Sequence, residues 1–181
     1  DTLYTTQPNA RDIAMHANAK EEYENDPLNA DKLIWFGRWT AYKGDYREAI
    51  KIYTEGISRF PADARMYRHR GHRYISIREF DRALKDFEFA AELINGTADK
   101  IEPDGMPNSL NIPVSSLHSN IWYHLALSYY LTNNLEKALE AYKKGIYLYN
   151  NDDNIISLTH WNYMALSMLG RKKEATSALE M

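Results

Sequence analysis

The chain has 181 residues, a formal net charge of -3 and no cysteine. Its length is sufficient for a sizeable core, and the absence of cysteine excludes disulfide bonds, thiolate catalysis and zinc sites built on cysteine. The weak net charge provides no global attraction to nucleic acid or to an anionic membrane, and no apolar run approaches the roughly 18 to 20 residues of a membrane-spanning helix.

The first segment with helical spacing covers residues 10–26. Residues 1–9 lack periodicity, and we expect them to form a flexible arm. Pro27 ends the helix, because proline lacks an amide proton and clashes with the preceding turn. Pro27 lies 34 residues before Pro61. Helix 10–26 is therefore predicted to be the second half of an incomplete repeat, which caps the N-terminal end of the domain.

Two helix–turn–helix units follow, at residues 30–63 and 64–95. Within each unit, apolar residues recur at helical spacing in two successive segments. In the first unit these segments are separated by Gly44 and Asp45, a pair that is typical of turns. Both units are therefore predicted to be helix hairpins.

Residues 96–118 form an insertion that interrupts this pattern. They include three prolines and two glycines, which prevent a helix. A structureless segment of this length inside a compact domain is often functional, and a tolerated surface loop is the simpler alternative. Because Leu110, Ile112, Val114 and Leu117 are apolar, we expect the insertion to fold back onto the helices.

A third unit occupies residues 119–152, and a less regular fourth unit occupies residues 153–181. In the fourth unit, the residues that match the first helix and those that match the second helix lie two positions closer together than in the other units. We therefore expect its turn to be shortened. Its helical pattern continues to Met181. This end favours either a truncated chain or a terminal helix that meets a partner.

Small and aromatic residues recur at fixed positions in the first three units. A pair of small residues twelve apart, with an aromatic residue four positions further on, indicates two closely packed helices. Such a hairpin cannot bury its apolar face alone, so the copies must stack into an all-α solenoid. The three copies of this set are Gly37, Ala49 and Tyr53; Gly71, Ala83 and Phe87; and Ala126, Ala138 and Tyr142.

These units resemble the tetratricopeptide repeat, a family of 34-residue helix–turn–helix repeats. The matching residues are Leu33, Phe36, Gly37, Thr40, Ala49, Tyr53, Gly56 and Pro61; Tyr67, Arg70, Gly71, Tyr74, Ala83, Phe87, Ala90 and Asn95; and Trp122, Leu125, Ala126, Tyr129, Ala138, Tyr142, Gly145 and Asn150. Departures are Thr40 at an aromatic position, Arg70 at an apolar position and asparagine at two proline positions. The resemblance implies one domain over residues 10–181, a right-handed superhelical solenoid of about 3.5 to 4.5 repeats with the N-terminal capping helix.

Family members typically hold a peptide or a partner helix in a concave groove, which the first helix of each repeat lines. By position, the resemblance assigns to this groove Ile34, Arg38 and Tyr42; Arg65, Arg68, His72 and Ile75; Tyr123, Leu127 and Tyr130; and Trp161. Some members clamp a C-terminal carboxylate with lysine and asparagine in the first repeat. Ile34 and Arg38 occupy those positions here, so that clamp is not matched.

The most basic segment of the chain includes Arg65, Arg68 and His72, whose spacing places them on one helix face. Cations near a helix N-terminus oppose the helix dipole. A bound carboxylate or phosphate would offset this cost, because arginine binds such groups bidentately. With Arg38 from the neighbouring helix, these residues form a candidate peptide- or anion-binding site. Pairing with acidic residues of neighbouring helices, or simple solvation, is the alternative.

Four groove aromatics, Tyr42, Tyr123, Tyr130 and Trp161, are candidate contacts for a ligand, and packing between helices is the alternative. We expect no enzymatic activity and no cofactor, because no Gly-rich phosphate loop, HExxH, nucleophile elbow or paired-carboxylate motif is present. We expect no metal site either, because His69 and His72 have no neighbouring carboxylate in the sequence.

These observations predict a scaffold that binds a protein or peptide, with acidic groups on the partner, and that neither binds nucleic acid nor inserts into a membrane. The alternative is a structural protein that forms homo-oligomers through its terminal helices, with the groove filled by residues 96–118. The start at Asp1 favours a processed chain exported to the periplasm or the exterior over a cytoplasmic one. Trimming for expression would produce the same start.

Overall fold

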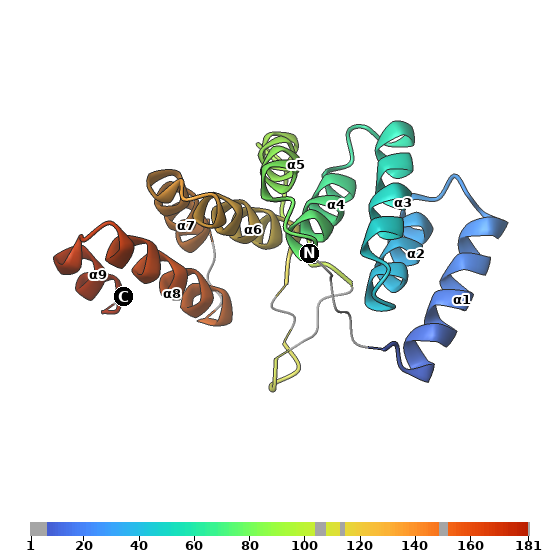
Figure 1. Cartoon of the computed structure of the whole chain (residues 1–181), viewed down its shortest axis with the longest axis horizontal. Coiled ribbons are helices and arrows are strands. Elements are labelled where there is room, and N and C mark those ends of the chain that lie inside the picture. Colours follow the sequence, from blue (N-terminus) through green and yellow to red (C-terminus); the bar gives the residue numbers. More distant parts are fainter. Residues whose placement is uncertain (1–6, 104–107, 113–114, 149–151, 181) are drawn as a thin grey trace. The chain divides into compact units, whose positions relative to one another are not determined.

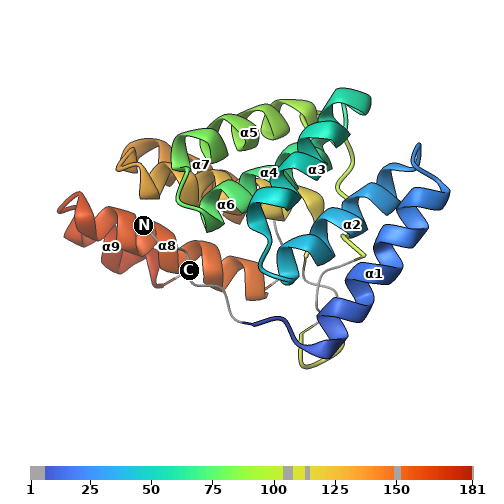
Figure 2. The same cartoon turned by 45° about the vertical axis from the view of Figure 1, so that its right-hand side comes forward.

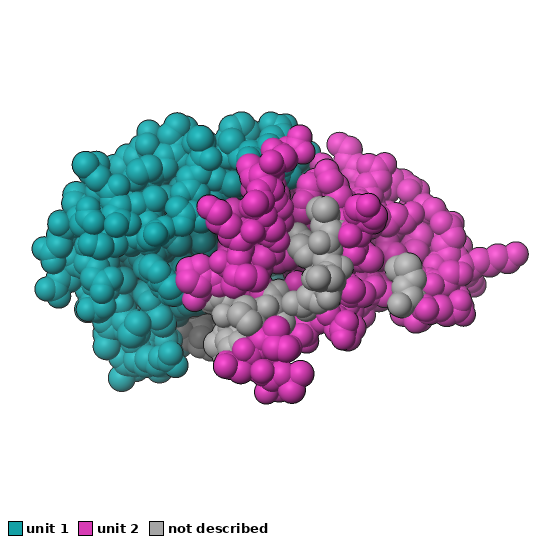
Figure 3. All heavy atoms as spheres, turned by 180° about the vertical axis from the view of Figure 1, so that it is seen from behind, with its two compact units in different colours: residues 1–93 teal, residues 94–181 magenta. Residues whose placement is uncertain are grey.

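The computed structural model describes residues 7–103, 108–112, 115–148 and 152–180, without the side chain at 148. Within these ranges every regular element is an α-helix (Figure 1), and none of these helices is long and apolar enough to cross a membrane. The prediction of an all-α chain is thus confirmed for the described residues. The chain divides into two compact units, residues 1–93 and 94–181 (Figure 3).

Unit 1 is a single helix followed by two helix hairpins, α2–α3 and α4–α5 (Figure 2). Each helix contacts the next one along the chain, and α2 also contacts α4. Asn9, Asn29 and Asp63 begin α1, α2 and α4 by accepting backbone N–H bonds with their side chains, which satisfies donors that have no intrahelical partner. The bounds of the helices are Ala10–Asn25 for α1, Ala30–Tyr42 for α2, Tyr46–Arg59 for α3, Ala64–Ser76 for α4 and Phe80–Leu93 for α5.

Unit 2 contains two further hairpins, α6–α7 and α8–α9. Consecutive helices are again in contact, and α6 also contacts α8. Ser116 begins α6 through a reciprocal pair of hydrogen bonds with Ser119. The bounds are Leu117–Leu131 for α6, Leu135–Leu148 for α7, Asp152–Met168 for α8 and Lys172–Ala178 for α9.

Glycine allows the two helices of each hairpin in unit 1 to cross closely. A Cβ atom on Gly37 would lie 2.6 Å from Cζ of Tyr53, and one on Gly71 would lie 2.8 Å from Cε2 of Phe87. Both rings are fully buried. The small-to-aromatic spacing that repeats along the sequence is therefore a direct contact between the helices of one hairpin.

The turn inside each of these four hairpins has the same backbone conformation. One residue in each has a positive φ: Gly44, Arg78, Asn133 and Gly170. In every turn, three successive amides donate to carbonyls four, three and five residues earlier. The expected shortening of the fourth turn is therefore wrong. The register shift lies within α8. Tyr163 stands seven residues before the turn residue Gly170, just as Gly37 stands seven residues before Gly44.

The insertion is described except for residues 104–107 and 113–114. Ile101 and Ser116 form an isolated antiparallel bridge, and the Asp99 carboxylate accepts hydrogen bonds from Ser116 Oγ and the His118 amide. Leu110 and Ile112 are 75% and 50% exposed. They lie in a local turn in which both of their amides donate to Asn108 Oδ1. The expectation that these two residues pack onto the helices is wrong, and Val114 lies outside the described residues.

Candidate functional site

The predicted basic site centres on a buried pair of rings in unit 1. Tyr53 and His69 stack with their centroids 5.4 Å apart and an interplanar angle of 12°, and both are buried. Arg68 Nη1 lies 2.9 Å from His69 Nδ1. Because a guanidinium can only donate, Nδ1 is the acceptor and His69 is neutral.

The charges of Arg38, Arg68, His72 and Arg73 all act on His69, and we call these four residues the arginine cluster. Burial lowers the pKa of His69 well below its usual range, and the positive charges of Arg68 and Arg38 lower it further. Burial also lowers the pKa of Arg38 and that of Arg73, and in both cases the charge of Arg68 contributes. The cluster therefore has a positive potential in a partly desolvated environment, where charge interactions are stronger than in water.

Aromatic rings stabilise the cations of the cluster. The Arg38 guanidinium lies 5.0 Å from the Trp35 ring centroid and 5.5 Å from that of Tyr42, within cation–π range. Arg38 Nη2 also donates to Tyr42 Oη at 2.7 Å. Tyr42 is about half exposed, whereas Arg38 and Arg68 are buried. The structure thus places Tyr42 beside the basic residues.

Arg65 is engaged elsewhere. Its guanidinium donates to the carboxylates of Asp63 and Asp31, which lie at the N-terminal ends of α4 and α2. The hydrogen bonds that Arg65 donates to Asp63 raise the pKa of Arg65. Arg65 therefore follows the alternative of pairing with neighbouring helices, and we leave it out of the site that we propose. Arg73 is not among the predicted site residues, although it belongs to the same basic run as Arg68.

The other three predicted aromatics meet in unit 2, on α6 and α8. Trp161 Nε1 donates to Tyr123 Oη at 2.9 Å, and the Trp161 and Tyr130 rings form an edge contact with centroids 5.3 Å apart. They pack over the buried Tyr142. The four aromatics are thus divided between the two units. In the described part of the chain, no group of three or more histidine and acidic side chains could hold a metal ion.

Known proteins share the fold of this chain. The sequence model described as tetratricopeptide repeat matches residues 119–152. Small glutamine-rich tetratricopeptide repeat-containing protein 2 of Saccharomyces cerevisiae is 27% identical over 147 residues, which cover 75% of this chain and 36% of that protein. The chain therefore spans about a third of the length of that relative.

Two solved structures have a similar fold. MamA 41-end from Desulfovibrio magneticus RS-1 matches with a TM-score of 0.71 at 18% identity, over 94% of this chain and 83% of that one. The first TPR of Spaghetti (RPAP3), bound to the HSP90 peptide SRMEEVD, matches with a TM-score of 0.62 at 20% identity, over 78% and 93%. Together with the match at residues 119–152, these likenesses confirm the predicted all-α fold of tetratricopeptide-like repeats.

Proposed function

We propose that this chain, a tetratricopeptide-repeat protein, is a binding module that holds an acidic segment of a protein or peptide partner. The proposal rests on Arg68, which bonds the buried His69 of a stacked pair of rings, and on the charges of Arg38 and Arg73, which act on the same two rings. A carboxylate of the partner would be attracted by the positive potential of the cluster and would accept charge-assisted hydrogen bonds from it.

Tyr42 and the four members of the arginine cluster have different roles in this proposal. Tyr42 is about half exposed, and His72 and Arg73 are also partly accessible, so these three would contact the ligand directly. Arg38 and Arg68 lie deeper and would attract the ligand through their charge. Trp161, Tyr123 and Tyr130 would form an apolar contact surface of their own on unit 2.

The similar structure of Spaghetti supports peptide binding as the general activity. The peptide bound to that protein, SRMEEVD, has three acidic residues. Its likeness to this chain concerns the fold, so the choice of peptide remains open. What supports an acidic ligand in this chain is the charge of its own cluster.

The proposal is tested by measuring, with fluorescence anisotropy, the affinity of the chain for a labelled peptide made of glutamate, serine and glycine. The control is the same peptide with glutamine at every glutamate position. We expect tighter binding of the glutamate peptide, and weaker binding as salt is added. Arg73→Gln should weaken binding about tenfold, because one charge-assisted hydrogen bond of about 1.5 kcal/mol is lost. Arg65→Gln is the matched control, since Arg65 is occupied by Asp31 and Asp63, and we expect less than a twofold change.

Equal affinity for the two peptides, or equal losses in the two variants, would refute the electrostatic part of the proposal. A variant with a short Gly–Ser linker in place of residues 103–113 tests the alternative that the insertion fills the groove, because removal of a competitor would raise the affinity. Sedimentation velocity at several concentrations tests the homo-oligomer alternative. Circular dichroism verifies that each variant is folded.

A further inference from the structure

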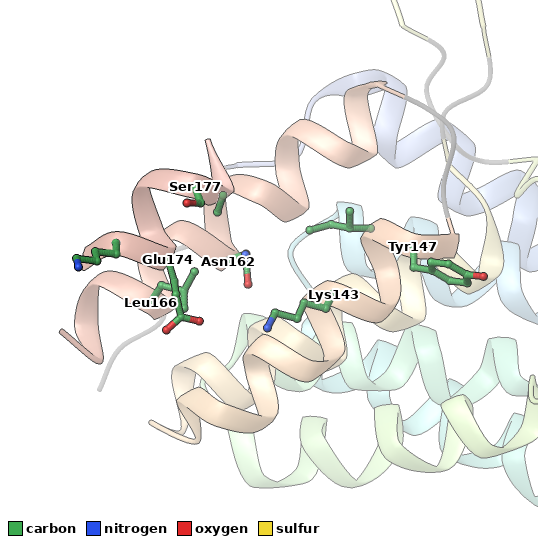
Figure 4. A pocket seen from close by; sticks show the side chains of 9 residues that line it. Lys143, Tyr147, Asn162, Leu166, Glu174 and Ser177 are labelled. Carbon is green, nitrogen blue, oxygen red and sulfur yellow. The ribbon is translucent and has the colours of Figure 1, made fainter. Parts of the chain in front are cut away.

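A pocket of about 560 Å³ opens in unit 2 between α7 and α9. Figure 4 shows side chains from these two helices and from α8 around it. Its apolar surface comes from Ile146, Leu166 and Ala178, and its polar groups include Asn162, Lys143 and Lys173. The pocket shares no residue with the arginine cluster and lies in the other unit.

Asn162 is a buried polar residue with an unsatisfied atom. It is 3% exposed, and its Oδ1 has no hydrogen-bond partner. In Figure 4 its amide lies at the centre of the pocket, between Glu174 and Lys143. A buried acceptor without a donor is destabilising, so a ligand that supplies an N–H group here would satisfy it.

The equivalent groove in unit 1, between α3 and α5, is filled by an ion pair. Arg70 Nε and Nη2 donate to the two oxygens of Asp86 at 2.8 and 2.7 Å, and Arg70 Nη1 donates to Thr54 Oγ1 at 3.1 Å. Arg70 comes from α4, which lies between the two helices that it bridges. The guanidinium and the carboxylate together occupy the space between α3 and α5.

The repeat register identifies the corresponding residues in unit 2. Arg70 and Asn162 each stand eight residues before the positive-φ residue of their turn, and Asp86 and Ala178 each stand eight residues after it. Lys143 likewise corresponds to Thr54. The pocket is therefore the space that an arginine–carboxylate pair fills in unit 1, left open here by two shorter side chains.

The charges around the pocket indicate what it binds. Lys143 and Lys173 form no ion pair with any described residue. The Glu174 carboxylate accepts two hydrogen bonds from Arg171, which lower its pKa, and the charge of Lys143 lowers it further. The lining thus favours an anion. An arginine side chain, which fills the groove of unit 1, would lack the Asp86 carboxylate and would meet two lysines.

We propose that this pocket binds a segment of a partner protein in which an apolar residue adjoins an acidic one. The apolar side chain lies between α7 and α9 against Leu166 and Ala178. A backbone N–H of the segment donates to Asn162 Oδ1, and the acidic side chain pairs with Lys143 and Lys173.

Anisotropy with a labelled hexapeptide of alternating leucine and glutamate tests this site, with serine for leucine and glutamine for glutamate in two control peptides. We expect both controls to bind at least tenfold more weakly. Lys173→Glu should weaken binding about tenfold, whereas Lys172→Glu, the same charge change on a neighbour that does not line the pocket, should change it less than twofold. Arg73→Gln should have no effect, which separates this site from the arginine cluster.

Two further variants act on the pocket itself. Asn162→Leu removes the unsatisfied oxygen, and we expect it to raise the melting temperature while it abolishes binding. The double variant Asn162→Arg with Ala178→Asp rebuilds the pair of unit 1 and should also abolish binding. Unchanged binding in both variants would overturn the proposal. A wild-type dimer that becomes monomeric in Ser177→Trp would also overturn it, because the occupant would then be a second copy of the chain.

Discussion

The groove between α3 and α5 and the groove between α7 and α9 have the same backbone framework and opposite contents. Arg70 and Asp86 fill the first with a bidentate ion pair, whereas Asn162 and Ala178 leave the second as a pocket. The helices and turns of a repeat can therefore be retained while a few side chains decide whether a groove is closed or available. In this chain, the difference marks unit 2 as the place to look for an additional ligand.

Arg70 also shows how a charged residue can occupy a position that is apolar in the repeat pattern. Its guanidinium lies 5.9 and 5.7 Å from the ring centroids of Tyr67 and Tyr74, and its charge is neutralised by Asp86. Burial raises the pKa of Asp86, and the hydrogen bonds from Arg70 oppose this effect. The long aliphatic stem of arginine packs like an apolar residue while its head reaches a partner.

The largest expected effect comes from breaking this pair. Asp86→Ala would leave a buried guanidinium without its partner, and we expect a loss of about 3 kcal/mol in the free energy of unfolding. Denaturant unfolding followed by circular dichroism measures it. Asp81→Ala, an exposed position on the same helix, is the control and should change stability by less than about 0.5 kcal/mol. A loss below about 1 kcal/mol would mean that Arg70 can turn to solvent and that packing alone closes the groove.

Acid should weaken unit 1 through His69. Its pKa is well below 6.5 in the folded state because of burial and the nearby arginines, whereas the unfolded chain takes up a proton near 6.5. Stability from this residue is therefore complete above about pH 6.5 and is lost as the pH falls below it, by up to about 2 kcal/mol at pH 5.

Unfolding of the wild type and of His69→Gln at pH 7 and pH 5 isolates this contribution, because the other titrating groups are common to both proteins. We expect the variant to lose less stability than the wild type on acidification. Equal losses would show that His69 becomes protonated in the folded state.

A smaller loss of stability is expected when the glycine at a close crossing of unit 1 is replaced by alanine, the residue that unit 2 has at the same position. The Cβ atom in Gly71→Ala would lie 2.8 Å from the buried ring of Phe87, and we expect a loss of about 1 to 2 kcal/mol from overpacking. Unit 2 has Ala126 at the same position, where it packs in the cluster of Tyr142. A double-mutant cycle of Gly71→Ala with Phe87→Leu measures the coupling energy of this contact. If the losses of stability in the two single variants simply add, the strain does not come from the contact with Phe87.

The hairpins were predictable because their defining contact is local. The residues of the pairs Gly37–Tyr53 and Gly71–Phe87 lie 16 positions apart, on two helices that a three-residue turn joins. A fixed turn and a fixed helical period bring these pairs together in both hairpins of unit 1. The prediction failed for the fourth turn because it assumed that small residues in α8 keep their register, whereas Tyr163 stands at the crossing.

The candidate site was only partly predictable. The spacing of Arg68 and His72 placed them on one helix face, but it could not show that Arg65 would instead pair with Asp31 from the preceding hairpin. Neither could it show that Arg70 would cross to Asp86 and Thr54. These contacts depend on how separate helices are oriented. The sequence offers each arginine several acidic residues as possible partners and does not show which of them lies nearest in the fold.

The amino-acid sequence by itself determined the helices and, in unit 1, the close crossings of the hairpins, since each depends on backbone conformation and side-chain size over a few turns of helix. Only the tertiary structure decided which cations are neutralised, which aromatics meet and which groove remains open. Those outcomes depend on side-chain lengths and charges that converge from three different helices, as Asn162, Ala178 and Lys143 do at the pocket.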